Sequence, residues 1–490
     1  MKFDFLNLFH VEGVWAVVLY VFIFVIVSFP LVIILLENRN PVKTLSWILV
    51  LVLIPFLGIL LYLYFGKNLR KEKIFTRKEF QDAEEARTML VEDLNLEEIR
   101  LNNNPKLCDK YHLMKLLYNN SKAILTQKNQ VKVLNNGEET FSHILQAIAQ
   151  AAHHIHLEYY IIEDDEIGNK VKDLLIDKRK QGVEVRLIYD DVGCWGLSDN
   201  YLNDLKQAGV ELYPFMPVST YRFANKINYR NHRKIIVIDG KFGFVGGLNI
   251  ADRYIKGKAD QGFWRDTHLM LEGDAVLSLQ MIFSMDWFFM SGKSLKEVKY
   301  FPQPTIEERT FVQIAASGPD SDWASIMQTY FSAIATAKEY VYISTPYFLP
   351  NDPIMVALRT ASLSGITIRI LLPERNDSFL TNWGSRSFFS DLLEAGVEIY
   401  LYTKGFTHSK LLMVDDIFAT VGTSNMDIRS FDQNFEVNAL IYDETTTKSL
   451  KLAFEEDLLY SSRVILEEFR SRPLHHKFME SFARLFTPVL

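Results

Sequence analysis

Two short patterns in this chain combine residue types that can carry out group transfer. Both have the form H-x-K-x4-D, and they are formed by His232, Lys234 and Asp239 and again by His408, Lys410 and Asp415. Each copy is followed at the same offset by an asparagine, Asn249 in the first and Asn425 in the second. Two chance matches with the same trailing residues are very improbable, so the duplication points to function.

Paired histidines and lysines suit the transfer of a phosphoryl or phosphatidyl group. One imidazole nitrogen can attack phosphorus and form a covalent intermediate. A second imidazole can protonate the leaving oxygen and later deprotonate the incoming alcohol. The two lysines, with Asn249 and Asn425, can hold the non-bridging oxygens of the phosphate. This scheme requires no metal ion and no other cofactor. For a single copy we would favour a structural histidine and a solvated lysine, but the duplication favours catalysis.

A buried strand is expected to position each pair. The segment 235–238 is β-branched and apolar on both faces, which is typical of a buried strand. Side chains at i and i+2 of a strand share a face, so His232 and Lys234 should point the same way. The Asp-Gly pair at Asp239 predicts a tight hairpin turn. Asp239, like Asp415, is therefore either part of the catalytic group or only a brace for its hairpin.

Acidic residues recur downstream of both patterns. Asp266 and Glu436 occupy matching places in two aligned segments, 264–268 and 435–438. A carboxylate that binds the second nitrogen of an imidazole fixes its tautomer and stabilises the imidazolium. The alternative is an acid on the surface of a strand. Which carboxylate would serve which histidine stays open at this level.

The surroundings of the two patterns are also repeated. Segment 182–189 matches 365–372, and segment 208–213 matches 395–400. Strands that alternate with helical stretches indicate an α/β fold. We therefore predict two equivalent α/β halves, which a pseudo-twofold axis can relate so that both histidines reach one cleft.

Composition limits the functional classes. The chain has 490 residues, 48% of them hydrophobic, which suggests a membrane portion in addition to large cores. Its net charge of −7 supplies no overall basic field, so nucleic acid is not an expected partner. The cysteines Cys108 and Cys194 lack metal-site spacing and suggest no disulfide framework. Three clustered histidines, at 153, 154 and 156, lack the other ligands of a metal site.

The amino-terminal region reads as a membrane hairpin, residues 1–66. Two apolar stretches of spanning length, about 14–36 and 44–66, flank a short polar loop. A cleaved signal peptide fits poorly, because the first run is too long and no small-residue cleavage site follows. Basic residues concentrate after the second span, so the positive-inside rule places the catalytic part in the cytoplasm. Residues 67–106 form a charged connector, 107–305 the first half, and 306–490 the second half with a carboxyl-terminal helix.

The duplicated pattern resembles that of the phospholipase D superfamily, and the two-span amino terminus is similar to that of its bacterial cardiolipin synthases. The resemblance covers nearly the whole chain. It implies two halves, each a mixed β-sheet flanked by helices, in a multi-pass protein of the bacterial plasma membrane. It also implies phosphatidyl transfer between two phosphatidylglycerol molecules, which gives cardiolipin and glycerol through a phosphatidyl-histidine. By family analogy His232 is the nucleophile and His408 the general acid and base, with the reverse left open, and acidic residues at Asp266 and Glu436 orient the imidazoles.

Two other functions remain open. A membrane-anchored phospholipase D would resolve the intermediate with water, and a catalytically inactive membrane scaffold would retain the motifs as relics. A further feature is an apolar stripe at helical spacing near the carboxyl end, formed by Phe478, Phe482, Leu485 and Phe486. It is either buried against the protein or placed in the membrane interface.

Overall fold

The structure is a computed structural model that describes residues 17, 21, 41–54, 57–59, 62, 104–218, 228–303 and 305–487 of the chain. The chain divides into two compact units, Met1–Leu69 and Arg70–Leu490, which are treated separately below.

The first unit is described only in part. Its helix α2 spans Pro41–Leu53, and the rings of Trp47 and Tyr62 make an edge contact at 5.5 Å. Within the described portion of the chain, no helix has both the length and the apolar character needed to cross a bilayer. Apart from residues 17 and 21, the expected span 14–36 lies outside the described residues, as do 55–56, 60–61 and 63–66 of the second span and 67–103 of the expected connector.

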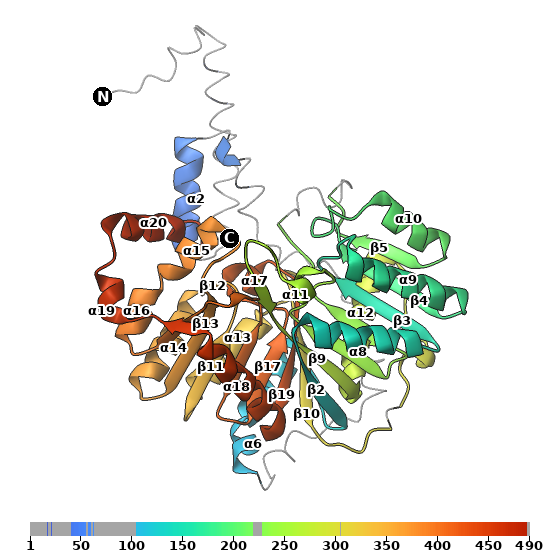
Figure 1. Cartoon of the computed structure of the whole chain (residues 1–490). Helices are drawn as coiled ribbons and strands as arrows, with labels where there is room; N and C mark the ends of the chain where they lie inside the picture. The colour runs from blue at the N-terminus through green and yellow to red at the C-terminus, as the bar shows by residue number, and fades with distance from the viewer. Residues whose placement is uncertain are drawn as a thin grey trace. The chain divides into compact units, whose positions relative to one another are not determined.

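The second unit contains a seven-stranded sheet that forms the first half (Figure 1). In spatial order its strands are β2 (Asn129–Asn135), β9 (Thr267–Gly273), β7 (Phe242–Gly246), β6 (Ile235–Ile238), β3 (His154–Tyr159), β4 (Glu184–Asp190) and β5 (Glu211–Phe215). The β3–β4 and β4–β5 pairs are parallel and the other pairs are antiparallel, so the sheet is mixed.

A nine-stranded sheet forms the second half and repeats this arrangement. Its strands in spatial order are β1 (Leu125–Thr126), β10 (Phe311–Ser317), β19 (Glu436–Tyr442), β17 (Phe418–Gly422), β16 (Leu411–Val414), β11 (Tyr340–Ser344), β13 (Thr367–Pro373), β14 (Glu398–Tyr402) and β20 (Ser461–Arg463). The seven strands from β10 to β14 match the first sheet one for one, including the parallel pairs. The predicted pair of α/β halves with mixed sheets is therefore confirmed.

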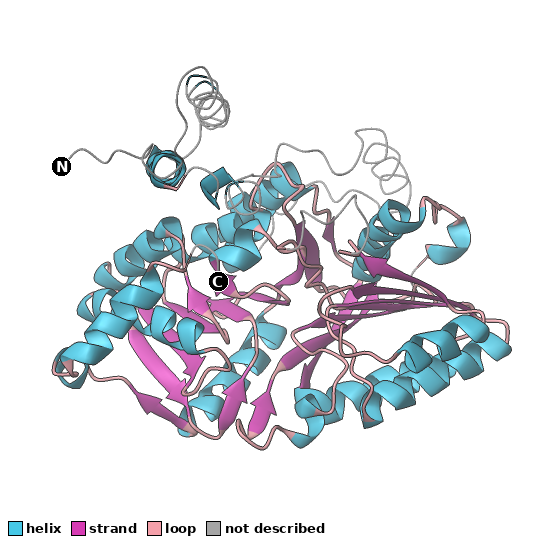
Figure 2. Cartoon of the chain, turned by 90° about the horizontal axis from the view of Figure 1, so that it is seen from above, coloured by secondary structure: helices cyan, strands magenta, loops and turns pink. Residues whose placement is uncertain are grey.

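Helices cover the outer faces of both sheets, as the view from above makes plain (Figure 2). On the first sheet these are α8 (Asn136–Gln150), α9 (Glu166–Lys180) and α10 (Asp199–Gln207); on the second they are α7 (Tyr111–Ser121), α13 (Ser325–Ala335), α14 (Asp352–Leu363) and α16 (Phe389–Glu394). The inner faces share one apolar cluster with α12 (Asp274–Ser291) and α18 (Glu444–Leu459). This shared core holds the two halves together.

The strand β6 shows how the sequence pattern becomes a core element. Ile235 and Val237 enter the core shared by both halves, whereas Ile236 and Ile238 pack beneath the outer helices. The strand is thus apolar on both faces, as predicted, because each face is covered. It begins at Ile235, so His232 and Lys234 precede it as extended backbone.

The start of the globular part differs from the expected boundary. The sequence places the first half from residue 107 onward, but α6 (Pro105–Asp109) and α7 pack in the core of the second half. Strand β1 also pairs with β10 of the second sheet, and Gln313 of β10 donates hydrogen bonds to the carbonyls of Met114 and Ala123. Residues 105–126 therefore belong structurally to the second half.

Candidate active site

His232 is held by a carboxylate that comes from the other half of the molecule. Its Nδ1 lies 3.0 Å from each carboxylate oxygen of Glu436, at the start of β19. Both side chains are buried. Thr423 donates a hydrogen bond to Oε2 of the same carboxylate at 2.5 Å. These contacts fix the ring so that Nε2 of His232 is the nitrogen left for chemistry.

His408 has the reciprocal arrangement. Its Nδ1 lies 2.7 Å from Oδ2 of Asp266, which belongs to the first half, and both side chains are buried. Asp266 also accepts a hydrogen bond from the amide of Thr267 at 2.7 Å. Each histidine of the duplicated pattern is therefore paired with the acidic residue of the opposite half.

Backbone hydrogen bonds also cross between the two halves beside each histidine. The amide of His232 donates to the carbonyl of Phe435 at 2.9 Å, and the amide of His408 donates to the carbonyl of Arg265 at 2.7 Å. In each case the acceptor immediately precedes the carboxylate residue. The short strands β8 (Phe263–Arg265) and β15 (Gly405–Thr407) pair in parallel beside His408. Backbone hydrogen bonds thus set the register between the two halves at the site itself.

The crossed histidine–carboxylate contacts bring the two motifs together, and the charges of each half act on the imidazole of the other. Burial lowers the pKa of His232 to about 4, opposed by the Glu436 carboxylate and assisted by the charges of Lys234 and Lys410. Burial also lowers the pKa of His408 well below its usual range, assisted by the positive charges of Lys410 and Lys234 and by His232. Both imidazoles are therefore neutral at neutral pH, and an anion bound between them would raise both pKa values.

Both lysines are buried beside the imidazoles. Nζ of Lys234 donates to the carbonyl of His232 at 2.7 Å, and Nζ of Lys410 donates to that of His408 at 2.5 Å. The carbonyl takes one of three N–H donors on each ammonium, so the geometry allows the others to reach a bound anion. Burial lowers the pKa of Lys234 to about 7 and that of Lys410 to about 8, each opposed by nearby carboxylates. Two cations are thus concentrated where a phosphodiester could neutralise them.

The acidic residues of the patterns, Asp239 and Asp415, lie away from the imidazoles. The Asp239 carboxylate accepts hydrogen bonds of 2.8–2.9 Å from the amides of residues 152–154, where β3 begins. Asp415 binds the amides of residues 338–340 in the same way and also receives Nζ of Lys110 at 3.2 Å. Four strand residues separate each acid from its lysine. The structure gives both acids the bracing role and does not bring them to the catalytic group.

The hairpin turns explain why an acid suits these two positions. Asp239 and Gly240 have φ of 55° and 63°, and the amide of Lys241 donates to the carbonyl of Ile238 at 2.9 Å. This is the predicted two-residue turn with left-handed residues. Asp415 has φ of 56°, and Asp is one of the few non-glycine residues that tolerates this region.

The side chains of the two asparagines differ in their hydrogen bonding. The Asn249 side chain donates to the hydroxyl of Tyr254 at 2.8 Å and accepts from the amide of Ile161 at 3.2 Å. Asn425 is buried, and its amide oxygen has no hydrogen-bond partner among the residues that the structure describes. A buried amide oxygen without a partner can accept a hydrogen bond from a substrate donor group.

Two site residues escaped the sequence reasoning. The hydroxyl of Tyr254 lies 3.5 Å from Nδ1 of His408, and no repeated residue type marked it, since the matching position in the second half is Ser430. Thr423 lies inside the repeated stretch, but no pattern in the neighbouring sequence indicates that its hydroxyl contacts Glu436. The matching residue is Gly247, where a Cβ would lie 2.1 Å from a carboxylate oxygen of Asp266. The two halves therefore support their carboxylates differently.

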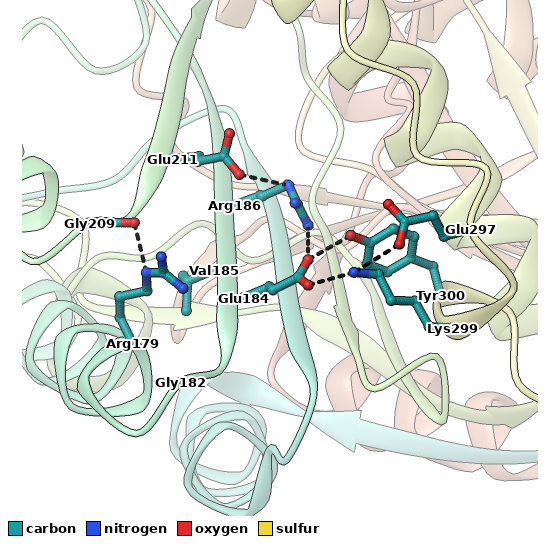
Figure 3. Close-up of a pocket in the computed structure, with 10 residues that line it drawn as sticks. All are labelled: Arg179, Gly182, Glu184, Val185, Arg186, Gly209, Glu211, Glu297, Lys299 and Tyr300. Atoms are coloured by element: carbon teal, nitrogen blue, oxygen red, sulfur yellow. Dashed lines mark hydrogen bonds and ion pairs between the residues drawn. The ribbon is translucent and has the colours of Figure 1, made fainter.

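Other polar clusters do not extend this site. In the described part of the chain, no three His, Cys, Asp or Glu side chains gather as a metal-binding group. His156 stacks on Phe283 at 4.6 Å and binds Gln280 at 2.9 Å, so it is a core residue. A polar cavity of about 430 Å³ lies elsewhere, with Arg186 and Lys299 both paired to Glu184 (Figure 3). No residue of the two patterns lines it.

Comparison with known families gives a match over most of the chain. Residues 144–287 and 330–458 match the family described as "Cardiolipin synthase, PLD-like domain". Residues 16–67 match the family described as "Phospholipase_D-nuclease N-terminal".

Similar proteins and structures agree with these matches. A cardiolipin synthase of Halalkalibacterium halodurans is 46% identical over 96% of this chain and 93% of its own. Cardiolipin synthase 2 of Bacillus anthracis is 45% identical over 94% and 89%. Among solved structures, a phosphatidylserine synthase of Haemophilus influenzae has a TM-score of 0.58 and 14% identity over 78% of this chain and all of that one, which supports the fold.

Proposed function

This chain belongs to the cardiolipin synthases of the phospholipase D superfamily, and we propose that it transfers a phosphatidyl group from one phosphatidylglycerol to another. The products are cardiolipin and glycerol. The observation that carries the proposal is the reciprocal pairing of the two imidazoles with Glu436 and Asp266 of opposite halves. It leaves one ring nitrogen of each histidine for a phosphorus atom bound between the halves.

The first step forms a phosphatidyl-histidine. Nε2 of His232 attacks the phosphorus of the donor lipid, so that a P–N bond forms while the P–O bond to glycerol breaks. Protonated His408 gives its proton to the departing glycerol oxygen. The bound phosphodiester and Asp266 favour that protonated form, because each is a negative charge beside the imidazole.

The second step releases the diphosphatidyl product. His408, now neutral, removes the proton from a free hydroxyl of the second phosphatidylglycerol, and the resulting oxygen attacks phosphorus. The P–N bond breaks and His232 is regenerated. One phosphodiester replaces another, so no nucleotide is consumed. Glu436 stabilises the positive charge on His232 in both steps, as the carboxylate does in the serine triad.

The lysines and asparagines bind the phosphate throughout. Lys234 and Lys410 lie beside the imidazoles, where their charges oppose that of the non-bridging oxygens. Asn425 and Asn249 add amide groups from the two halves. The assignment of His232 as the nucleophile follows the family analogy. It is also supported by Glu436, the carboxylate that contacts His232. Burial raises the pKa of Glu436, but His232, Lys234 and Thr423 lower it further, so the pKa lies below its usual value.

The amino-terminal region bears on where in the cell the enzyme acts. We propose that residues 1–66 form a membrane hairpin and 67–106 a connector, with the catalytic halves on the cytoplasmic side of the bacterial plasma membrane. Its substrates stay in the bilayer, so an enzyme anchored there meets them without extracting them. The match of residues 16–67 to an amino-terminal family module supports this organisation.

One assay separates the three candidate functions. The purified full-length enzyme is given vesicles of phosphatidylglycerol labelled in the head-group glycerol, with and without a chelator. Cardiolipin plus free glycerol, unaffected by the chelator, is the expected result. Phosphatidic acid plus glycerol would replace the proposal with lipid hydrolysis. Equal output from the wild type and His408→Ala would instead support a scaffold that lacks this activity.

A further inference from the structure

The carboxyl-terminal helix α20 (Leu474–Arg484) turns its apolar side away from the protein. Leu474, Phe478 and Leu485 are 81%, 68% and 75% exposed. They lie on one face, because their spacing of four and seven residues keeps them within a narrow arc of an α-helix. Glu480 and Ala483 are buried on the opposite face. A helix at the surface of a soluble domain normally has the reverse orientation.

Ion pairs hold the helix in this orientation. The Glu480 carboxylate receives Nη2 of Arg472 at 2.6 Å and lies 3.7 Å from Nε of Arg386. Arg472 is therefore bidentate, since its Nε also donates to Glu480 at 2.9 Å. Removing such a buried acid from its partners is costly, so the polar face is fixed inward and the apolar stripe outward.

A neighbouring helix extends the exposed apolar surface. α15 (Phe379–Arg386) packs along α20, and the two run beside each other in Figure 1. Phe379 is 63% exposed, and Trp383 lies 6.2 Å from it and 5.0 Å from the ring of His476 on α20. The exposed cations Lys477 and Arg484 lie along one edge of the stripe on α20, and Arg484 also donates to the carbonyl of Ser387 at 3.3 Å. We call Phe379, Leu474, Phe478, Phe482, Leu485 and Phe486 the apolar face.

We propose that this apolar face docks on the surface of an anionic lipid bilayer, with α20 lying in the interface. Leucine and phenylalanine on one side with lysine and arginine at its edge is the composition of an interfacial helix, because the apolar side chains enter the acyl boundary and the cations meet lipid phosphates. Scattered single apolar residues need no partner, but a contiguous face of this kind does.

The position of the face relative to the catalytic residues supports a bilayer as its occupant. The loop before α15 contacts the strand end that leads into the site: the Asn376 amide donates to the carbonyl of Pro346, and Tyr347 donates to Asp377 at 2.7 Å. Two residues before Tyr347, the Thr345 hydroxyl accepts a hydrogen bond of 3.1 Å from the amide of Met426, which directly follows Asn425. Docking would hold this side of the site against the lipid. The purpose of the docking rests on the proposed function, whereas the contact with the bilayer does not.

A depth measurement tests the contact. Full-length protein is prepared with Cys108→Ser, Cys194→Ser and Phe478→Cys, labelled with an environment-sensitive fluorophore, and placed in vesicles of phosphatidylglycerol and phosphatidylcholine. Matched controls carry Leu363→Cys or Leu459→Cys, which are 74% and 81% exposed on α14 and α18. We expect a blue shift and quenching by lipids spin-labelled near the head group for Phe478→Cys only. A label on Phe478→Cys that is as accessible to water as the control labels overturns the proposal. So does a label that is buried but not quenched by lipid, which is the result expected if another segment or a second copy covers the face.

A kinetic comparison tests its consequence. The variant Leu474→Ser, Phe478→Ser, Leu485→Ser is compared with Leu363→Ser, Leu452→Ser, Leu459→Ser, which removes equally exposed leucines elsewhere. We expect the first variant to lose about tenfold in kcat/KM on vesicles, because interfacial binding scales with buried apolar area, and to match the wild type on monomeric short-chain phosphatidylglycerol. Equal losses on both substrates would refute docking. A wild type that makes no cardiolipin would refute the proposed function while leaving the quenching result to decide the contact.

Discussion

Glu436 and His232 lie in opposite halves of the molecule, yet both carboxylate oxygens of Glu436 are 3.0 Å from Nδ1 of the imidazole. Asp266 holds His408 in the same way from the other side. Neither half can therefore assemble a complete histidine–carboxylate pair alone. The duplicated chain makes one site with two crossed pairs, and this crossing leads to the first prediction.

Neutralising either carboxylate should impair catalysis through the histidine of the other half. We expect Glu436→Gln and Asp266→Asn each to lower kcat by about 10²–10⁴, since an amide cannot stabilise the imidazolium and permits the wrong tautomer. Rates of cardiolipin formation under saturating lipid measure the effect. Circular dichroism and thermal unfolding of each variant should match the wild type. A rate within threefold of the wild type, roughly 0.6 kcal/mol, would remove the carboxylate from the mechanism.

A donor with an activated leaving group should distinguish the two histidines. Phosphatidyl-p-nitrophenol needs no protonation of its leaving oxygen, so a protein lacking only the general acid can still form the intermediate. We expect His408→Ala to release one equivalent of p-nitrophenol in a burst, and His232→Ala to release none. Rapid-mixing absorbance provides the measurement. The opposite pattern would assign the nucleophile to His408, as the pseudo-symmetry allows.

The buried lysines predict loss of activity at alkaline pH. Because burial lowers the pKa of Lys234 to about 7 and that of Lys410 to about 8, raising the pH through this range removes two positive charges from the free enzyme. We expect kcat/KM to fall between about pH 7 and about pH 9, and kcat to fall at higher pH because the bound anion favours protonated lysines. Initial rates across the range in buffers of equal ionic strength would show it. A kcat/KM that stays constant to about pH 9.5 would mean that the lysines keep ordinary pKa values.

The hairpin acids should matter for stability more than for chemistry. Asp239→Ala removes an acceptor of three backbone amides and leaves alanine at a φ of 55°, so we expect about 2–4 kcal/mol of destabilisation. Asp239→Asn keeps the tolerance for this φ and part of the hydrogen bonding, so it should cost about half as much. Thermal midpoints in detergent measure both. A large loss of kcat in Asp239→Asn at a temperature where the protein stays folded would return this acid to the catalytic group.

The residues between each histidine and lysine predict an asymmetry between the halves. Arg233 is buried and forms an ion pair with Asp286, whereas the hydroxyl of its counterpart Ser409 lies 3.3 Å from the hydroxyl of Thr267. We expect Arg233→Met to destabilise the protein by about 3–5 kcal/mol, because it leaves the Asp286 charge buried without its partner. Ser409→Ala, the matched change, should cost about 1 kcal/mol or less. The double variant Arg233→Met, Asp286→Leu should recover stability, and no recovery would place the cost elsewhere.

Much of the fold could be read from local patterns. The β-branched run 235–238 predicted a strand covered on both faces, and the Asp-Gly pair predicted the turn, because backbone preference and side-chain alternation act over a few residues. The repeated segments predicted two equivalent halves, because similar local sequences favour similar strands and helices. Local patterns did not reveal that residues 105–126 join the second half, since that choice depends on which core the apolar side chains of α7 enter.

The amino-acid sequence thus specified which residues could do the chemistry: two imidazoles, two ammonium groups and two acids at matching positions. Only the folded chain decided their partners. His232 and Glu436 are 204 positions apart, and His408 and Asp266 are 142 apart, so no local pattern links them. They meet because the two sheets pack face to face through a shared core, and contacts across such an interface depend on the register of whole halves. The same register left Asp239 and Asp415 at the far ends of their strands.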